Sequence, residues 1–292
     1  MSENNINEFD KLWDYNKPGE TEKKFRKLIP EAEKLKDKSK YLELLTQIAR
    51  TEGLQRRFED AHKTLDKAMK MILPEHITPR IRYMLERGRV YNSSKETEKA
   101  AEIFNAAFQQ AVKYQEDFYA IDAAHMMGIA EKEEESLKWN EIAIGMAEES
   151  KDKRANGWLG SLYNNTAWTY HDMKQYEKAL ELFEKNVKWH SERNSNQKMI
   201  SIARWSVART LRSMGKINEA LEIQMELERE MNEKQIENGG YNYEEIGECL
   251  LLLNKKEEAK PYFKKAHELL SQDIWLQANE KERLARLEDL SE

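Results

Sequence analysis

The chain is poor in the residues on which disulfide-linked and turn-rich folds depend. Its 292 residues include one cysteine, Cys249, so an internal disulfide is excluded. A lone cysteine on an apolar helix is typically a small buried residue rather than a nucleophile. Five prolines and 11 glycines leave few obligatory turns, which suits a fold made of soluble amphipathic helices.

Long apolar runs and a positive charge excess are also missing. No stretch approaches the roughly 18 apolar residues of a membrane span, and the first ten residues lack the basic start and apolar run of a secretory signal. We therefore expect a cytoplasmic protein with no membrane partner. The formal charge of −6 makes nucleic acid an unlikely partner, because non-specific binding to phosphates needs a basic face.

Motifs for metal binding and catalysis are absent as well. The six histidines form no His-Glu-x-x-His pair or other metal-ligand spacing. No Gly-x-Gly-x-x-Gly loop, Walker-type loop or Gly-x-Ser-x-Gly elbow occurs. The sequence therefore predicts a protein that is not an enzyme and has no metal or cofactor.

What the chain does contain is an internal repeat. Small residues near the start of similar sequence segments, such as Tyr176–Phe183 and Ile217–Gln224, recur every 36 to 43 residues. These small residues are Ala61, Ala100, Ser136, Ala179, Ala220 and Ala259. A period in this range predicts a solenoid of stacked helix pairs, in which each pair mainly contacts its neighbours.

Each predicted pair has a first helix with a large–small–large pattern and a second helix with a small–bulky–small pattern. Tyr163, Ala167 and Tyr170 illustrate the first, and Ala100 and Phe104 belong to the second. The small residue would let a neighbouring helix approach closely. The six pairs are expected at about 40–72, 80–114, 117–150, 157–191, 199–232 and 240–271.

These residues resemble tetratricopeptide repeats over about 40–271. The resemblance implies an all-α fold, a right-handed α-solenoid of about six helix pairs, and it implies almost nothing about function. The period exceeds the family's usual ~34 residues, and pair three is the weakest match because Ser136 and Asn140 fill its alanine and bulky slots. The arrangement also looks like uncharacterised bacterial proteins of this repeat class.

Segments outside the repeats are predicted to cap an otherwise continuous solenoid of residues 40–272. Residues 1–39 form an N-terminal helical cap whose apolar stripe is interrupted at Pro30, where we expect a kink or break. Residues 273–292 form one capping helix that carries Trp275, Leu284 and Leu287. This helix would cover the apolar run Leu250–Leu253, although a dimer partner could also do so.

One stripe of the first helices carries more arginine and aromatic residues than a scaffold needs. Counted from the small residue, it takes the positions three before, one after and four after, and we expect it to face solvent in a concave groove. Arginine and aromatics are typical of binding hot spots. The predicted ligand-binding residues are Arg50, Arg89, Asn92, His125, Asn164, Trp168, His171, Trp205, Arg209 and Arg212.

The stripe predicts a scaffold that binds a protein or peptide partner. Trp168 and Trp205 would be apolar anchors, Arg209 and Arg212 would hold carboxylates, and Asn164 would bond the ligand backbone. Related repeats that clamp C-terminal carboxylates use lysine and asparagine at comparable positions, and this chain has only the asparagine.

Three alternatives stay open at this point. The arginines could instead pair with acidic residues of the next helix, for example Arg89 with Asp122. The protein could be a small-molecule binder or enzyme with a pocket of His125, His171 and arginines. It could also bind single-stranded nucleic acid by tryptophan stacking, which a steep salt dependence would indicate. The sequence does not determine the oligomeric state.

Overall fold

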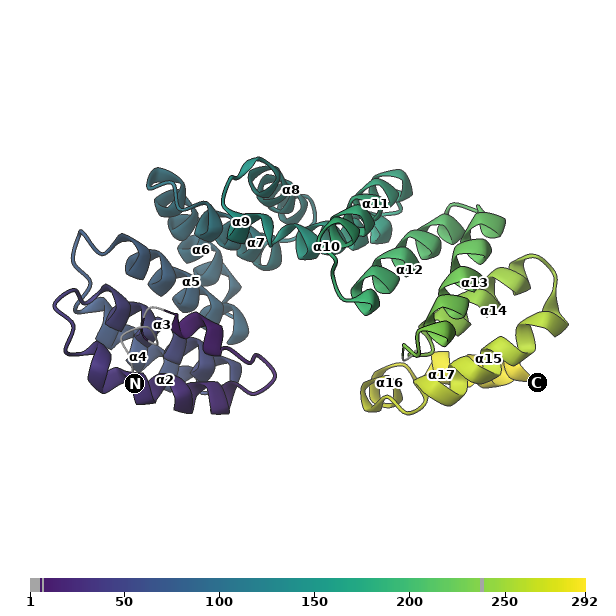
Figure 1. Ribbon diagram of the computed structural model, residues 1–292, viewed down its shortest axis with the longest axis horizontal. Helices are drawn as coiled ribbons and strands as arrows, with labels where there is room; N and C mark the ends of the chain where they lie inside the picture. Colours follow the sequence, from purple (N-terminus) through teal and green to yellow (C-terminus); the bar gives the residue numbers. More distant parts are fainter. Residues whose placement is uncertain (1–5, 7, 237–238) are drawn as a thin grey trace. The chain divides into compact units, whose positions relative to one another are not determined.

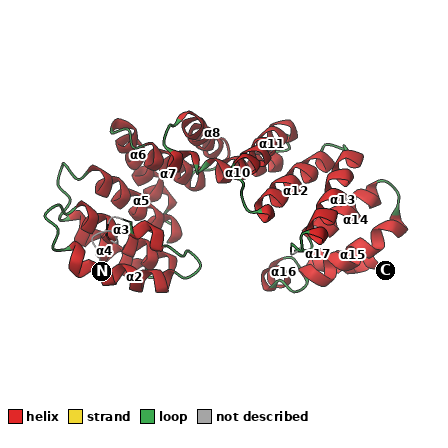
Figure 2. Cartoon of the chain, viewed as in Figure 1, coloured by secondary structure: helices red, strands yellow, loops and turns green. Residues whose placement is uncertain are grey.

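The computed structural model describes residues 6, 8–236 and 239–292, and within these residues the secondary structure is helical (Figures 1 and 2). The predicted all-α fold is confirmed. The chain divides into two compact units, Met1–Trp158 and Leu159–Glu292, which we describe separately. Whether residues 40–272 form one continuous solenoid stays a prediction.

Unit 1 contains the first three predicted pairs, and its successive first helices α3, α5 and α7 contact one another. The elements, in chain order, are η1 (Phe9–Leu12), α2 (Pro18–Ala32), α3 (Ser39–Leu54), α4 (Phe58–Met69), α5 (Ile77–Ser93), α6 (Thr97–Lys113), α7 (Asp117–Ala130), α8 (Glu133–Glu149) and α9 (Lys153–Asn156).

Unit 2 contains the remaining three pairs, and α12 contacts both its own partner and the first helix of the next pair. Its elements are α10 (Leu159–Asp172), α11 (Tyr176–Glu192), α12 (Gln197–Ser213), α13 (Ile217–Glu233), α14 (Tyr241–Leu252), α15 (Lys256–Leu270), α16 (Ile274–Asn279) and α17 (Lys281–Ser291).

The turn between the two helices of a pair follows one design in five of the six pairs. A residue with positive φ ends the first helix, and the next backbone N–H donates to the carbonyl five residues earlier, as Glu96 does to Tyr91 at 2.8 Å. This pattern is a left-handed helix stop. The turn residues are Arg56, Lys95, Lys174, Gly215 and Asn254. Pair three departs from the design, since Glu131 there is extended.

The close approach of helices predicted at the small residue is confirmed in pairs two and six. A Cβ placed on Gly88 would lie 2.5 Å from the ring of Phe104, and one on Gly247 would lie 2.8 Å from the ring of Phe263. Both phenylalanines are buried. In these two pairs the helices therefore pack closely because the first helix has no side chain at the crossing.

Pair three replaces this apolar contact by a polar one. The Asn140 amide lies against Gly128 and donates to the Ser136 carbonyl at 3.0 Å. The Ser136 hydroxyl in turn donates to the Gly128 carbonyl at 2.5 Å. The weakest match in the sequence is therefore a hydrogen-bonded version of the same helix crossing.

The N-terminal segment packs on the first helix of pair one. Phe25 and Leu28 of α2 are buried against Leu44 and Ile48 of α3. Of the kink or break expected at Pro30, the break is wrong, because α2 continues through Pro30 to Ala32. The proline therefore lies in the last turn of α2, close to the natural end of the helix.

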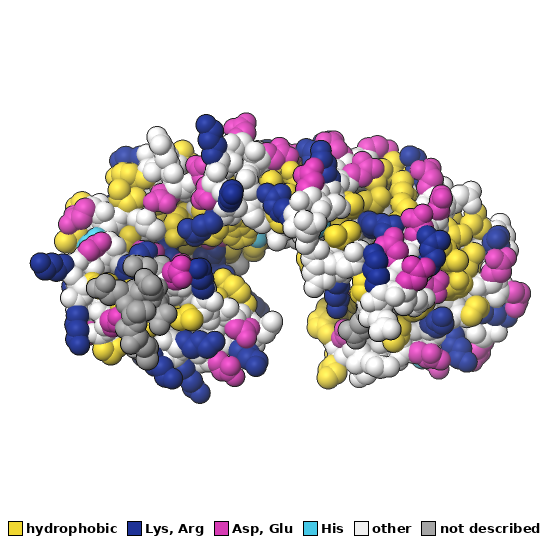
Figure 3. All heavy atoms as spheres, viewed as in Figure 1, with side chains coloured by type: hydrophobic (Ala, Val, Ile, Leu, Met, Phe, Trp, Pro, Cys, Tyr) yellow, Lys and Arg dark blue, Asp and Glu magenta, His cyan; other side chains and the backbone are white. Residues whose placement is uncertain are grey.

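The C-terminal cap consists of two helices rather than one, because α16 ends before Glu280 and α17 follows it. Leu276 of α16 and Leu287 of α17 are buried in one cluster with Leu250. The cap therefore covers the start of the Leu250–Leu253 run. Trp275, predicted on the apolar face, is instead 61% exposed. Charged side chains of both signs are interspersed over the visible face of each unit (Figure 3).

Candidate functional site

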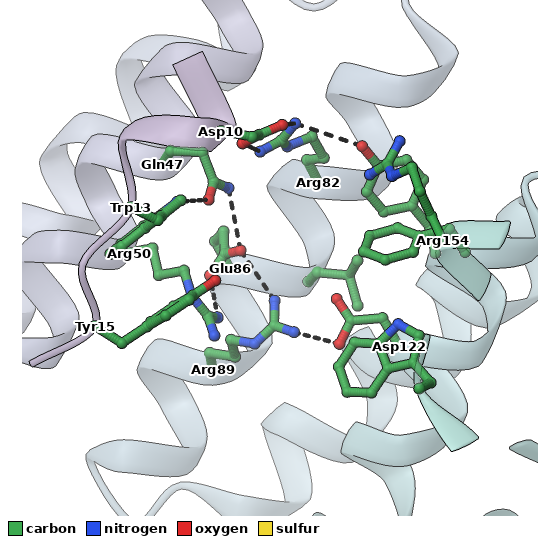
Figure 4. Close-up of a pocket in the computed structure, with 14 residues that line it drawn as sticks. Asp10, Trp13, Tyr15, Gln47, Arg50, Arg82, Glu86, Arg89, Asp122 and Arg154 are labelled. Carbon is green, nitrogen blue, oxygen red and sulfur yellow. Dashed lines mark hydrogen bonds and ion pairs between the residues drawn. The ribbon is translucent and has the colours of Figure 1, made fainter. Parts of the chain in front are cut away.

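A cavity of about 220 Å³ lies on the face of unit 1 formed by α3, α5 and α7, and we call it the unit-1 pocket (Figure 4). It combines four arginines with five aromatic residues. Its lining is Asp10, Trp13, Tyr15, Gln47, Arg50, Arg82, Leu85, Glu86, Arg89, Phe118, Tyr119, Asp122, Arg154 and Trp158.

Ion pairs between successive helices hold two of the predicted arginines in place. Glu86 of α5 accepts from Arg50 of α3 at 3.1 Å and from Arg89 at 2.9 Å. Arg89 also pairs with Asp122 of α7. These two carboxylates raise the pKa of Arg89 against the opposing effect of burial. The alternative pairing of Arg89 with Asp122 is confirmed.

Arg82 forms a second ion-pair cluster at the other end of the pocket. Its guanidinium donates to Asp10 at 2.6 and 2.9 Å and to Glu43 at 3.0 Å. Glu43 and Arg82 are both buried. Four carboxylates, those of Asp10, Glu43, Glu86 and Asp122, therefore offset the charges of Arg50, Arg82 and Arg89.

The N-terminal segment forms one wall of the pocket. Trp13 and Tyr15 stack with ring centroids 4.6 Å apart, the Trp13 indole donates to Gln47 at 3.0 Å, and Tyr15 covers the guanidinium of Arg50 at 5.5 Å. Figure 4 shows both rings beside Arg50 and Arg89. The segment expected only to cap the first pair therefore also contributes to the candidate site.

Several nitrogen atoms of this region have no partner. Arg50 Nε and Trp158 Nε1 are buried and have no hydrogen-bond partner among the described residues. Arg154 stacks on Phe118 with its guanidinium carbon 4.2 Å from the ring centre, and it forms no ion pair with any carboxylate of the described residues. The pocket therefore presents unused N–H donors and one unpaired cation.

The other two predicted residues of unit 1 lie beside this pocket. The His125 ring lies 5.4 Å from the Trp158 ring, its Nδ1 is buried without a partner, and burial lowers its pKa. Asn92 lines a neighbouring hollow of about 200 Å³ together with Arg50 and Arg89. The structure thus brings Arg50, Arg89, Asn92 and His125 into one region.

In unit 2, the predicted aromatic residues form a connected cluster. The Trp168 ring lies 5.9 Å from that of Trp205 and 5.1 Å from that of His171. The Trp205 indole donates to the Tyr241 carbonyl at 3.3 Å. Asn164 donates to the side chain of Asn165 at 3.2 Å.

The predicted carboxylate-binding arginines of unit 2 already hold a carboxylate of this chain. Arg212 donates to both oxygens of Glu245, at 2.7 and 3.1 Å, and Arg209 Nε lies 3.0 Å from the same group. Glu245 is buried. The arginines of both units therefore link the first helix of one pair to the first helix of the next.

The prediction that the whole stripe faces solvent is wrong. Thr46, Leu85, Ile121 and Glu244 belong to the stripe and are buried, and the ten predicted binding residues are all partly buried rather than exposed. The next first helix covers this face, because α3 packs on α5 and α12 contacts α14.

Sequence reasoning missed several residues that line the unit-1 pocket, among them Asp10, Trp13, Tyr15 and Arg154. They lie outside the repeat, in the entry segment or in α9, so the repeat register does not reach them. The aromatic-rich stretch Phe9–Tyr15, ahead of the turn at Lys17, was the available signal.

The arrangement closest to a catalytic one lies in unit 2. His171 Nε2 lies 2.9 Å from the Ser213 hydroxyl, and burial lowers the pKa of His171. Its Nδ1 is 3.8 Å from the Asp172 carboxylate, beyond hydrogen-bond distance, and Asp172 is exposed. Arg209 also donates to Ser213, at 3.3 Å. The residues described here include no group of three or more potential metal ligands.

Comparison with protein-family models identifies two of the helix pairs. The tetratricopeptide repeat model matches residues 160–189 and 241–269, which correspond to α10–α11 and α14–α15. The resemblance stated from the sequence is confirmed at these pairs. No curated protein matches the chain. In the described part of the chain, none of the helices has the length and apolar character required to cross a membrane.

Solved structures with the same architecture are distant in sequence. The apo form of RapI is 12% identical, with a TM-score of 0.72 over 93% of this chain and 75% of that one. A signal transduction ATPase with a tetratricopeptide repeat sensor, from Pyrococcus horikoshii, is 19% identical, with a TM-score of 0.72 over 91% of this chain and 42% of that one. The apo quorum sensor NprR from B. thuringiensis is 15% identical, with a TM-score of 0.61 over 97% and 79%. These similarities show the fold.

Proposed function

We propose that this chain, a tetratricopeptide-repeat scaffold, is non-catalytic and binds a peptide segment of a partner protein in the unit-1 pocket. The observation that carries the proposal is the set of unused donors there. Arg50 Nε and Trp158 Nε1 are buried without partners, and both groups can only donate. A ligand that satisfies them must supply acceptors, and a peptide backbone supplies one carbonyl oxygen per residue.

The charges of the pocket favour a peptide with one acidic group near its rim. Arg50, Arg82 and Arg89 are offset by carboxylates of this chain, so they do not demand a strongly acidic ligand. Arg154 has no such partner in the described part of the chain and is exposed above Phe118. A carboxylate of the ligand would pair with Arg154, and Trp13, Tyr15 and Phe118 would contact apolar side chains.

A display selection of random peptides against the full-length protein tests the proposal. The affinity of a selected peptide is then measured for Trp158→Phe, which keeps an aromatic ring but removes the indole donor, and for Arg154→Glu. Loss of one hydrogen bond is worth about 0.5–1.5 kcal/mol, so we expect Trp158→Phe to weaken binding roughly two- to tenfold. Charge reversal at Arg154 should weaken an acidic peptide further.

Arg193→Glu is the matched control. Arg193 stacks on Trp189 at 4.5 Å and, like Arg154, is exposed without an ion pair among the described residues, but it lies in unit 2. Unchanged affinity of Arg193→Glu with reduced affinity of Arg154→Glu supports the pocket. Equal affinities of all three variants and the wild type would place binding elsewhere, for example at the predicted anchors Trp168 and Trp205.

The alternative of an enzyme has its best support in the contact between His171 and Ser213. A fluorophosphonate probe, which labels serine nucleophiles, tests it directly. We expect no labelling, because the hydroxyl also binds Arg209 and the Asp172 carboxylate is too far away to orient the imidazole. Labelling that Ser213→Ala abolishes would favour the enzyme.

The nucleic-acid alternative depends on free arginines next to Trp168 and Trp205. Arg209 and Arg212 both form ion pairs with Glu245, so their guanidinium groups are already bound to a carboxylate of this chain. We therefore expect weak binding of oligo(dT) at physiological salt, measured by fluorescence anisotropy. Tight binding that falls steeply with salt would instead favour this alternative.

A further inference from the structure

Unit 2 contains a second cavity, separate from the pocket assigned above. It measures about 480 Å³ and lies between the start of α12, the end of α13 and the start of α14. Apolar side chains provide most of its wall, namely those of Ile202, Trp205, Met231 and Tyr241. A mostly apolar cavity of roughly 300–1,000 Å³ with few polar groups is typical of a small-molecule site.

Two polar groups of this cavity lack partners. The Ser201 hydroxyl is buried, with the residue 1% exposed, and has no hydrogen bond to any residue that the structure describes. Leaving such a group unsatisfied costs about 1–3 kcal/mol, which a ligand oxygen could recover. Lys198, one helical turn away on α12, is exposed and forms no ion pair with a described carboxylate.

The remaining polar side chain is already engaged. Asn242 donates to the carbonyl and to the side-chain oxygen of Gln224, at 3.0 and 2.7 Å. The cavity therefore offers one buried hydroxyl and one cation beside a large apolar wall. A peptide backbone would bring two polar groups per residue into it, more than these side chains can satisfy.

We propose that this cavity binds a single-chain amphiphile, a fatty carboxylate. Its acyl chain lies against Ile202, Trp205, Met231 and Tyr241, and its carboxylate accepts from Ser201 and pairs with Lys198. The positive end of the α12 dipole adds to the attraction for the negative head group. Ile202 and Tyr241, 44% and 39% exposed, mark the entrance through which the chain enters.

Titration of the full-length protein with dodecanoate, below its micellar concentration, tests the proposal by calorimetry. We expect saturable binding that Ile202→Glu abolishes, because the new carboxylate would lie among apolar groups and repel the ligand. Met199→Glu is the control, since Met199 is equally exposed on α12 but does not line the cavity. Both variants change exposed residues, and circular dichroism verifies that they fold. No saturation with the wild type, or equal binding by Ile202→Glu, overturns the proposal.

Further variants test the head group. Lys198→Ala should weaken dodecanoate roughly two- to fivefold, as expected for an exposed ion pair, and should leave dodecanol binding unchanged. Ser201→Ala should raise the melting temperature of the free protein, because it removes an unsatisfied hydroxyl, yet weaken dodecanoate binding. An equal loss for dodecanol and dodecanoate in Lys198→Ala would contradict the assigned head-group contact.

The same titration separates this site from the peptide site. Trp158→Phe and Arg154→Glu should bind dodecanoate as the wild type does, and Ile202→Glu should retain any peptide selected for the unit-1 pocket. Displacement of dodecanoate by that peptide would overturn the assignment of two independent sites.

Discussion

Arg212 and Glu245 form a bidentate ion pair between α12 and α14, with nitrogen–oxygen distances of 2.7 and 3.1 Å. Arg209 joins the same carboxylate at 3.0 Å. Glu86 occupies the corresponding place in unit 1, between Arg50 and Arg89. Pairs of this type connect first helices that neighbour one another, so these arginines stabilise the stacking of the repeats.

The first prediction concerns the cost of breaking this link. Glu245→Gln should lower the free energy of unfolding by roughly 3 kcal/mol, because two partly buried arginines lose their charge partner. Glu248→Gln, on the same helix, should cost no more than about 1 kcal/mol, since its partner Arg286 is 49% exposed. Urea denaturation measures both. Equal costs would show that the Glu245 pair contributes no more than a surface contact.

A second prediction uses two glycines in different surroundings. Gly88→Ala should destabilise the protein by about 1–3 kcal/mol, because its Cβ would lie 2.5 Å from the Phe104 ring. Gly145 lies within α8 and has open space around a Cβ, so Gly145→Ala should stabilise by about 0.5–1 kcal/mol. Melting curves should move in opposite directions, and a stabilising Gly88→Ala would contradict the close helix crossing.

How much the sequence predicts depends on whether a contact is local and periodic. The spacing of Gly88 and Phe104 recurs at Ala167 and Phe183 and at Gly247 and Phe263, so the residue spacing was enough to predict the helix pairs and their core. The contact between Asp10 and Arg82 joins residues 72 positions apart without any period. No spacing rule could therefore place the N-terminal segment against α3 and α5.

The candidate site was predictable only in part for the same reason. The stripe includes Arg50 and Arg89, which line the pocket, but the pattern could not tell whether these arginines were free. That depends on Glu86 and Asp122, which sit on the covered faces of neighbouring helices. Polar residues on a helix face are equally compatible with exposure to solvent and with ion pairs to a neighbouring helix.

The third prediction concerns the C-terminal cap. Removal of residues 273–292 takes away Leu276, Leu284 and Leu287, which are buried against the cluster of Ile246 and Leu250. An uncovered terminal pair exposes this core, so we expect aggregation or a lower melting temperature. Light scattering and circular dichroism measure the outcome. A monomeric truncated protein with unchanged melting would show that the cap is dispensable.

The last prediction concerns acid stability. Burial lowers the pKa of His125 below its usual value near 6.5, so the folded state takes up the proton less readily than the unfolded state. Above pH 6.5 the imidazole is neutral in both states and has no effect. As the pH falls from 6.5 through the lower pKa of the folded state, the unfolded chain binds more protons and stability is lost. His125→Phe should therefore reduce the fall in the free energy of unfolding between pH 7.5 and 5.5, as measured by urea denaturation.

Burial also lowers the pKa values of His62, His171 and His190, so a smaller fall of the same sign should remain in the variant. An unchanged fall would mean that His125 accepts its proton equally well in both states, and that its unpartnered Nδ1 is not shielded from water.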